Sequence, residues 1–236
     1  MERFTYQGQE LALFRDAVNW KRYWSSILRP FVTGRVLDVG AGLGDNARYL
    51  HNSTVTAWCF LEPDERLLHH NQRQHDGEPG LASPSFFTGT IASLPAGKTF
   101  DTIIYIDVLE HILDDRQELE RASRHLKAGG HLIVLSPAFP ALFSDFDKSI
   151  GHYRRYTRQS LIDIAPRRLG LIKLHYIDAV GMVTSLANRF LLRSALPNPT
   201  LIRTWDRLLV PISRIVDPIL PFRLGKSIYG VWTRSM

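Results

Sequence analysis

Hydrophobic positions along this chain follow two alternating periods. Five short apolar runs predict buried strands, at residues 35–39, 55–61, 86–89, 102–106 and 131–135. Between several of these runs, apolar residues recur at helical spacing and predict helices at residues 45–51, 63–75 and 115–126. The alternation indicates βαβ units, in which helices cover both faces of a parallel sheet.

The pattern changes toward both ends of the chain. Before the first strand, residues 10–28 predict a single amphipathic helix that Pro30 ends. After the fifth strand, residues 161–169 predict a helix, and residues 172–177 and 227–233 predict the last two strands. The roughly fifty residues between those two strands are apolar, rich in arginine and interrupted by prolines, which is typical of inserted helices.

A glycine-rich turn follows the first predicted strand. Gly40, Gly42 and Gly44 lie between this strand and a helix, where glycine permits positive φ and lets a ligand approach the backbone. The dinucleotide pattern G-x-G-x-x-G would need a small residue at position 45, but the chain has Asp45. A carboxylate there disfavours a pyrophosphate. The turn therefore argues against an NAD-dependent oxidoreductase and favours a cationic ligand.

The segment VLDVGAGLG, residues 36–44, resembles the cofactor motif of the class I, Rossmann-like S-adenosylmethionine-dependent methyltransferases of the small-molecule branch. The resemblance extends over roughly residues 36–137. It implies an α/β fold with a seven-stranded, mostly parallel sheet and helices on both faces, to which the residues between the last two strands add the expected helical insertion. It also implies S-adenosyl-L-methionine as the methyl donor. The residues that it places at the donor are Asp38, Gly40, Ala41, Gly42, Glu62, Pro63, Thr90, Ile91, Ile106, Asp107 and Val108.

Three of these positions have specific expected roles. The resemblance implies that Asp38 orients the loop and the methionyl ammonium. Glu62 ends the second strand about twenty residues after the loop, where an acid accepts both ribose hydroxyls. Thr90 stands where the family usually has an acid that bonds the adenine amino group, so we expect a backbone contact from Ile91 there instead.

An acidic and histidine-rich run follows the fourth strand. If the chain is helical there, Asp107, Glu110 and His111 lie at i, i+3 and i+4 on one face and can hold a divalent ion. Certain ubiquinone-pathway and small-RNA 2′-O-methyltransferases look similar, with a further histidine at the place of His152. Many members of the family need no metal, and we expect none here. A metal set of Asp107, Glu110, His111 and His152 stays the alternative, with RNA 2′-O-methyl transfer as the corresponding function.

The connection after the fifth strand, residues 135–156, is long and aromatic, as functional loops are. His152 is the best candidate base because its ordinary pKa lies near neutrality. Phe139, Phe143 and Phe146 are predicted to form an apolar wall. The alternative is that Tyr153 and its neighbours pin the loop to the domain. The predicted catalytic residues are His152, His111, Asp147 and Tyr153.

Composition narrows the cellular setting. A single cysteine, Cys59, excludes an intramolecular disulfide, and we expect a cytoplasmic protein without a signal peptide or membrane span. From residue 171 onward, nine basic side chains face three acidic ones, which accounts for the whole net charge of +6. We expect one domain, comprising an N-terminal helical segment (1–34), a cofactor-binding core (35–178), a helical lid or insertion (179–226) and the last strand (227–236).

The expected partner is a small, partly lipophilic acceptor. Nucleic acid is not expected, because the sequence has no separate RNA-binding module. The basic insertion at residues 179–226 leaves three roles open: a lid over the acceptor, the interface of a homodimer, or a peripheral contact with a membrane or lipid. A non-catalytic membrane-surface protein with the same fold is the remaining alternative.

Overall fold

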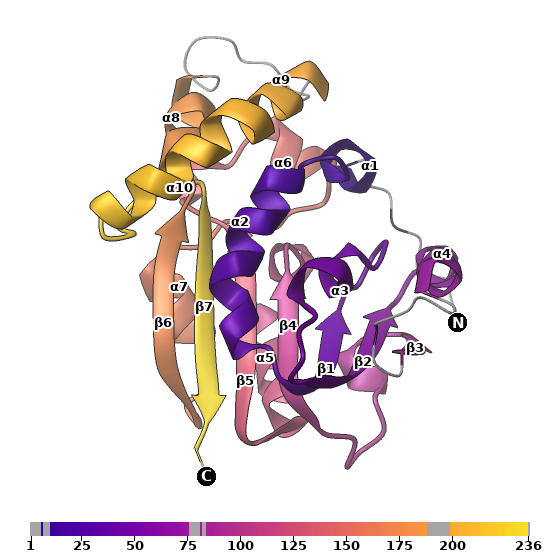
Figure 1. The fold of residues 1–236 in the computed structure, drawn as a ribbon. Coiled ribbons are helices and arrows are strands. Elements are labelled where there is room, and N and C mark those ends of the chain that lie inside the picture. Colours follow the sequence, from indigo (N-terminus) through magenta and orange to yellow (C-terminus); the bar gives the residue numbers. More distant parts are fainter. Residues whose placement is uncertain (1–5, 7–9, 76–80, 82–83, 188–198, 236) are drawn as a thin grey trace.

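One twisted sheet organises the molecule (Figure 1). The computed structural model describes residues 6, 10–75, 81, 84–187 and 199–235. Its strands are β1 (Gly34–Val39), β2 (Val55–Glu62), β3 (Pro84–Thr88), β4 (Phe100–Ile106), β5 (Leu126–Pro137), β6 (Leu169–Ile177) and β7 (Ser227–Arg234). They lie in the order β3-β2-β1-β4-β5-β7-β6, and β7 alone runs antiparallel to its neighbours. The predicted fold class is confirmed.

Helices cover both faces of this sheet, as the alternating pattern predicts. They are α1 (Glu10–Phe14), α2 (Val18–Leu28), α3 (Asp45–Leu50), α4 (Glu65–His75), α5 (Asp115–Arg124), α6 (Asp145–Ser149), α7 (Arg158–Ile164), α8 (Ala179–Ala187), α9 (Pro199–Thr204) and α10 (Val210–Ile219). In Figure 1, α2 crosses the front of the sheet and α5 and α7 lie behind it. Each face has its own apolar core, around Trp24 and Trp58 on the α2 side and around Leu119 and Trp232 on the other.

Two predicted helices differ from the structure for local reasons. Residues 10–28 do not form one helix, because the chain breaks at residues 15–17 between α1 and α2. The predicted helix at 161–169 ends at Ile164 instead. Ala165 precedes Pro166 and adopts an extended conformation, which the proline ring favours in the residue before it.

The insertion between β6 and β7 is helical, and buried aspartates fix it to the rest of the fold. Asp206 accepts hydrogen bonds from the backbone N–H groups of Asn19 (3.2 Å) and Trp20 (2.8 Å), so it caps α2 from a distance of 187 residues along the chain. Ala17, at the N-cap itself, has no side chain that can do this. The missing local cap explains why the start of α2 depends on a residue from the insertion.

Asp217 performs the same task for α8. Its carboxylate accepts the backbone N–H groups of Asp178 (2.6 Å) and Ala179 (2.9 Å), and also the hydroxyl of Tyr23 (2.6 Å) on α2. Asp178 in turn accepts the indole N–H of Trp205 at 2.8 Å. The helical insertion is therefore tied both to α2 and to the end of β6.

A π-helical turn, Trp205–Leu209, joins α9 to α10. Both Trp205 and Asp206 are buried in this turn, because its wider winding presents adjacent residues to the core. None of the helices in the described ranges is both long and apolar enough to cross a bilayer.

At the sheet edge, the pairing of β6 with β7 shifts register between Leu171 and Lys173. The division of the chain into segments within one domain stays a prediction.

The capping of α2 by Asp206 leads to a stability prediction. Changing Asp206 to Ala leaves two buried N–H groups without a partner, so we expect a loss of about 1–3 kcal/mol in the free energy of unfolding. Urea unfolding followed by circular dichroism measures this loss. The exposed neighbour Arg207 provides the control, and Arg207→Ala should change stability by less than about 0.5 kcal/mol. Equal stability of the two variants would contradict the capping role.

Candidate functional site

A cavity of about 240 Å³ opens at the carboxyl ends of β1, β4 and β5. This is where open α/β sheets bind ligands, at the point where the strand order reverses between β1 and β4. One side is formed by the glycine turn and the end of β4. The opposite side is aromatic, and its members are Tyr6, Phe14, Trp20, Trp24, Phe146 and Trp205. The cavity therefore joins a backbone-lined half to an apolar half.

The glycine turn needs glycine for a steric reason. Gly40 has a φ of +63°, and a Cβ atom there would lie 2.7 Å from Cγ1 of Val108. Its N–H group bonds to the carbonyl of Leu61 at 2.8 Å. The loop after β1 is thus packed directly against the ends of β2 and β4, and its backbone faces the cavity.

Glu62 fastens this loop from the end of β2. It is 4% exposed, and its two oxygens accept the backbone N–H groups of Gly42 and Asp64, each at 2.9 Å. Burial raises the pKa of Glu62, while these two backbone bonds lower it. A carboxylate oxygen has a second lone pair, so each oxygen can still accept a hydroxyl. Glu62 therefore shapes the loop as well as offering a diol-binding group.

Asp38 and Asp45 flank the same turn. Asp38 is fully buried, with one oxygen bonded to the Asn46 side chain at 3.0 Å and the other without a partner among the described residues. Burial raises its pKa to about 7, partly offset by the Asn46 bond. Asp45 starts α3 and forms an ion pair with Lys21 at 2.5 Å. A buried, unpaired carboxylate oxygen suits a cationic ligand.

Five other residues expected at the donor lie at or shortly after the ends of β2, β3 and β4. Pro63 follows Glu62 directly, and Thr90 and Ile91 begin the short helical turn Ile91–Ser93 after β3. Thr90 is exposed, its backbone N–H bonded to the Ser93 hydroxyl at 3.1 Å, whereas the Ile91 side chain is buried. Ile106 and Asp107 line the cavity from the end of β4.

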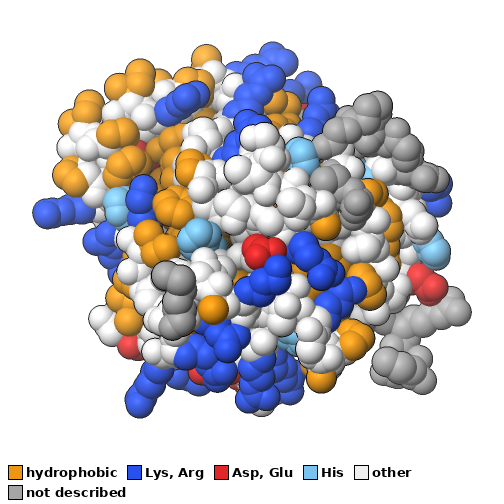
Figure 2. Space-filling model, turned by 60° about the horizontal axis from the view of Figure 1, so that its bottom comes forward, with side chains coloured by type: hydrophobic (Ala, Val, Ile, Leu, Met, Phe, Trp, Pro, Cys, Tyr) orange, Lys and Arg blue, Asp and Glu red, His pale blue; other side chains and the backbone are white. Residues whose placement is uncertain are grey.

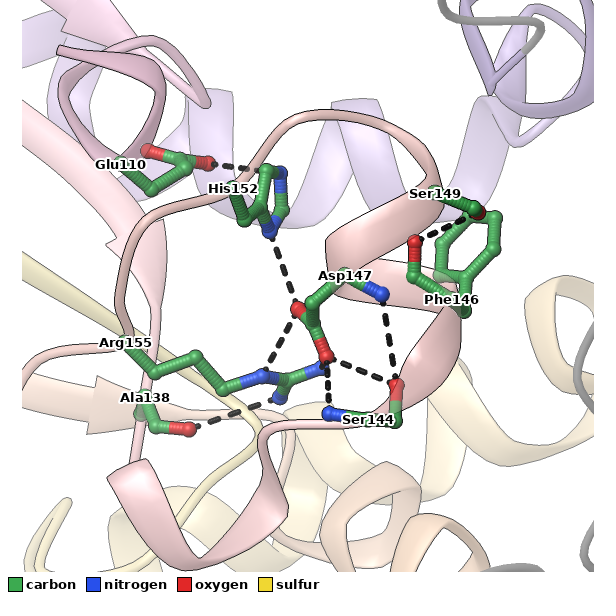
Figure 3. Close-up of polar contacts among 8 residues, drawn as sticks. All are labelled: Glu110, Ala138, Ser144, Phe146, Asp147, Ser149, His152 and Arg155. Atoms are coloured by element: carbon green, nitrogen blue, oxygen red, sulfur yellow. Dashed lines mark hydrogen bonds and ion pairs between the residues drawn. The ribbon is translucent and has the colours of Figure 1, made fainter.

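A histidine and an aspartate form a hydrogen-bonded pair beside the cavity (Figure 3). His152 Nδ1 lies 2.9 Å from Asp147 Oδ1, and both residues line the cavity. Arg155 binds both oxygens of Asp147, at 2.9 and 3.0 Å, and Ser144 donates to it from its N–H and its hydroxyl. Burial alone would raise the pKa of Asp147, but the bonds from His152 and Arg155 hold it well below its usual range. Asp147 is therefore a charged group that orients His152.

The other ring nitrogen of His152 faces a buried acid. Nε2 lies 3.8 Å from Glu110 Oε1 (Figure 3). Glu110 is fully buried, and neither of its oxygens has a hydrogen-bond partner among the described residues. Burial and the neighbouring Asp107 raise the pKa of Glu110 well above its usual range. Ligand atoms of Glu110, His111 and His152 all lie within 4.8 Å of one another.

Asp107 and His111 complete the titratable cluster. Desolvation by the surrounding protein raises the pKa of Asp107 to about 6, although this residue is exposed where it lines the cavity, while His152 and Lys226 lower it. Burial and the nearby His152 lower the pKa of His111 to about 4. His111 is therefore neutral at pH 7. The chain forms a 3₁₀ turn, Leu109–His111, instead of the expected α-helix, and Asp107 has a φ of +53° outside it.

Comparison with known proteins agrees with this arrangement. Residues 37–132 match the methyltransferase domain family. The sarcosine/dimethylglycine N-methyltransferase of Aphanothece halophytica is 31% identical over 144 residues, which cover 53% of this chain and 50% of that protein. The structure of the N-methyltransferase NodS from Bradyrhizobium japonicum WM9, in complex with S-adenosyl-L-homocysteine, superposes with a TM-score of 0.61 at 11% identity, covering 98% of this chain and 95% of that one.

The matched residues 37–132 and the order of the seven strands agree with the expected class I, S-adenosylmethionine-dependent methyltransferase fold. A further relative is the ubiquinone/menaquinone biosynthesis C-methyltransferase UbiE of Ruegeria sp. (strain TM1040), 27% identical over 171 residues that cover 72% of this chain and 65% of that protein. The chain thus spans half to two thirds of the length of these two curated relatives. The match to the methyltransferase domain falls on the segment that contains the glycine turn and Glu62.

Of the predicted site residues, eight line the cavity, namely Gly40, Ala41, Gly42, Ile106, Asp107, His111, Asp147 and His152. The residues Asp38, Glu62, Pro63, Thr90, Ile91, Val108 and Tyr153 are not part of the lining. Tyr153 is 55% exposed and is not among the described residues that line the cavity, because its N–H is bonded to the Glu110 carbonyl at 2.9 Å and its side chain points outward. Phe139 stacks on Tyr176 at 4.5 Å in the opposite core, so only Phe146 of the expected aromatic wall lines the cavity.

Several residues of the cavity were not predicted from the sequence. Tyr6 reaches across it, with its N–H bonded to Asp64 at 2.8 Å and its ring 5.9 Å from that of His111. Trp20 and Trp24 were assigned to an amphipathic helix, but the sequence does not say which surface their side chains cover. Lys226 lies with Nζ 4.1 Å from the centre of the Trp205 ring. It precedes β7, where only the three-dimensional pairing brings it to the site.

We expect Glu62→Ala to weaken binding of S-adenosylmethionine by about 2 kcal/mol, roughly 30-fold, through loss of a charge-assisted contact. Isothermal titration calorimetry measures this affinity. Glu65→Ala, three residues later on exposed α4 surface, is the matched control and should bind as wild type does. Wild-type protein that gives neither heat nor a thermal shift with S-adenosylmethionine would contradict the assignment of this half of the cavity.

Proposed function

We propose that this protein transfers the methyl group of S-adenosylmethionine to a small, partly lipophilic acceptor. The observation that carries the proposal is the continuity of one cavity, which connects the glycine turn to an aromatic chamber with His152 at its side. The named activities of the relatives, on sarcosine and dimethylglycine and in ubiquinone biosynthesis, are both transfers to small molecules and support this class of acceptor.

The donor supplies a methyl group on a sulfonium, whose displacement by a nucleophile releases a neutral thioether. What the chain must contribute is alignment of the two reactants and exclusion of water. The turn at residues 40–42, Glu62 and the unpaired oxygen of Asp38 fix the donor at the end of β1. The aromatic side chains of Trp20, Trp24 and Trp205 line the other half, where a bound acceptor would displace water from an apolar surface.

His152 is our candidate for taking the acceptor's proton. Asp147 holds Nδ1, which fixes the proton there and leaves Nε2 free to accept another proton from a hydroxyl or an ammonium. The charge of Asp147 also stabilises the imidazolium that results. Asp147 itself is saturated by Arg155 and Ser144, so we assign it to positioning, not to proton transfer.

The chamber also suggests what the acceptor looks like. Its walls are aromatic, and Lys226 adds a cation that is partly buried against Trp205, where burial lowers its pKa. Such a surface suits a planar or hydrocarbon group with one polar end. Cytoplasmic location and a homodimer stay predictions.

The proton-transfer role leads to a kinetic prediction. With an acceptor identified from ligand that co-purifies with the protein, His152→Ala should lower kcat by about 10²–10⁴-fold while the Kd for S-adenosylmethionine stays within about twofold. Formation of S-adenosylhomocysteine measures the rate. Asp147→Asn should lower kcat less and shift its pH dependence, because the base remains. An unchanged kcat in His152→Ala would remove this residue from the chemistry.

A divalent cation at Glu110, His111 and His152 is the second candidate arrangement. The buried, unpartnered carboxyl of Glu110 beside two imidazoles fits the ligand preferences of such ions. A cation there would lower the pKa of an acceptor hydroxyl. His152 would then be a ligand, and its Nε2 would not be free to act as a base. The raised pKa of Glu110 means that a cation would have to compete with a proton for this carboxyl, which favours the arrangement without metal.

Removal of metal ions separates these two arrangements. We expect full activity in EDTA and no rise in melting temperature when Mg²⁺ or Mn²⁺ is added. Loss of activity in EDTA that either ion restores, together with stabilisation by that ion, would favour the metal arrangement. Glu110→Gln tests the same point, because it replaces the carboxyl with a neutral amide of the same shape that binds cations poorly.

A further inference from the structure

The outer surface of the helical insertion is apolar to an unusual degree. Among the residues that the structure describes, thirteen large hydrophobic side chains are exposed, and eight of them lie between residues 183 and 224. They are Val183, Leu201, Leu208, Ile212, Ile215, Ile219, Leu220 and Leu224. In Figure 2, hydrophobic side chains gather at the upper left of the visible face, on the side of the molecule where α10 lies in Figure 1.

Five of these side chains form one stripe along the helical run α9–α10. Leu201, Leu208, Ile212, Ile215 and Ile219 follow one another at intervals of seven, four, three and four residues, which is the spacing of a single helix face. Ile215 and Ile219 are 67% and 71% exposed. The opposite face of the same run, with Ile202, Val210 and Ser213, is buried. The run therefore has hydrophobic side chains on both sides, and only one side is covered by the residues that the structure describes.

The charged side chains on this surface all have one sign. Residues 199–224 include Arg203, Arg207, Arg214 and Arg223, and each of them is exposed. The acids of this fully described stretch, Asp206 and Asp217, are buried and occupied by backbone N–H groups. Arg203, Arg207 and Arg214 repeat at intervals of four and seven residues, so they form a second row beside the apolar stripe.

We propose that the outer face of α9–α10 is a docking surface for an anionic lipid bilayer. An apolar stripe next to a row of arginines is the arrangement of an interfacial helix, whose hydrocarbon side chains enter the acyl boundary while guanidinium groups bind phosphates. A bilayer supplies both an apolar interior for the stripe and anionic phosphates for the arginines. A second copy of this chain would supply the apolar complement but would add further arginines opposite the first.

Docking to a bilayer does not depend on the proposed methyl transfer, but it would affect which acceptors reach the cavity. Trp205 lies in the same helical run and lines the cavity from its inner side. A bilayer on the outer side would place the aromatic chamber next to a reservoir of lipophilic molecules.

The test measures binding to vesicles of defined composition. We expect the protein to sediment with vesicles of three parts phosphatidylcholine to one part phosphatidylglycerol at least tenfold more strongly than with phosphatidylcholine alone. Raising the salt from about 0.1 M to about 0.5 M should weaken the binding, because surface charges are screened. Ile215→Ser with Ile219→Ser should reduce binding about tenfold or more. The control, Leu113→Ser with Ile162→Ser, alters two exposed hydrophobic side chains elsewhere on the molecule and should bind normally.

A labelling experiment locates the contact. Cys59 is the only cysteine and is buried, so an Ile215→Cys variant can be labelled selectively with a polarity-sensitive dye. Its emission should shift to the blue on anionic vesicles, whereas the same dye at Leu113→Cys should not respond. Equal binding to neutral vesicles, unchanged binding of the Ile215/Ile219 variant, or a dimer in sedimentation that this variant converts to a monomer would each overturn the proposal.

Discussion

Buried carboxylates that accept backbone N–H groups hold this molecule in shape. Glu62 fastens the loop after β1, while Asp206 and Asp217 begin α2 and α8. In each case the acid lies far along the chain from at least one of its donors. A carboxylate removed from water is costly unless its lone pairs are used, and a buried N–H group is costly unless it has an acceptor. Here the buried carboxylates accept the buried N–H groups, so each satisfies the other. The loop after β1 and the starts of α2 and α8 therefore depend on these acids.

These hydrogen bonds between distant residues also explain which parts of the fold could be predicted from the sequence. Strands β1, β2 and β4 are buried on both faces, so their apolar runs stand out in the sequence. The glycine turn and Glu62 are marked by spacing alone. The break between α1 and α2 is not, because Asp206 caps α2 from the insertion, and no local signal at Ala17 announces a helix start. A hydrogen-bond partner that lies far along the chain cannot be recognised from the residues around a helix start.

The site divides in a similar way. The donor half is built from residues next to the ends of consecutive strands, and a motif therefore finds it. The acceptor half is assembled from Tyr6, Trp24, Trp205 and Lys226, which come from both ends of the chain. Sequence alone suggested His152 as a base but not that Arg155 and Ser144 would saturate its partner Asp147. Phe139 was misplaced because the direction of a side chain in an irregular loop depends on the backbone, here with φ of +59°.

The irregular pairing of β6 has a consequence for how copies of the protein meet in a crowded cell. β6 is an outer strand of the sheet, with Leu171 and Ile172 exposed, and an open strand with apolar side chains is a template for aggregation. The register shift between Leu171 and Lys173 bends this strand, and the lysine adds a charge beside the apolar pair. Fibril-like growth from this edge of the sheet is thereby discouraged.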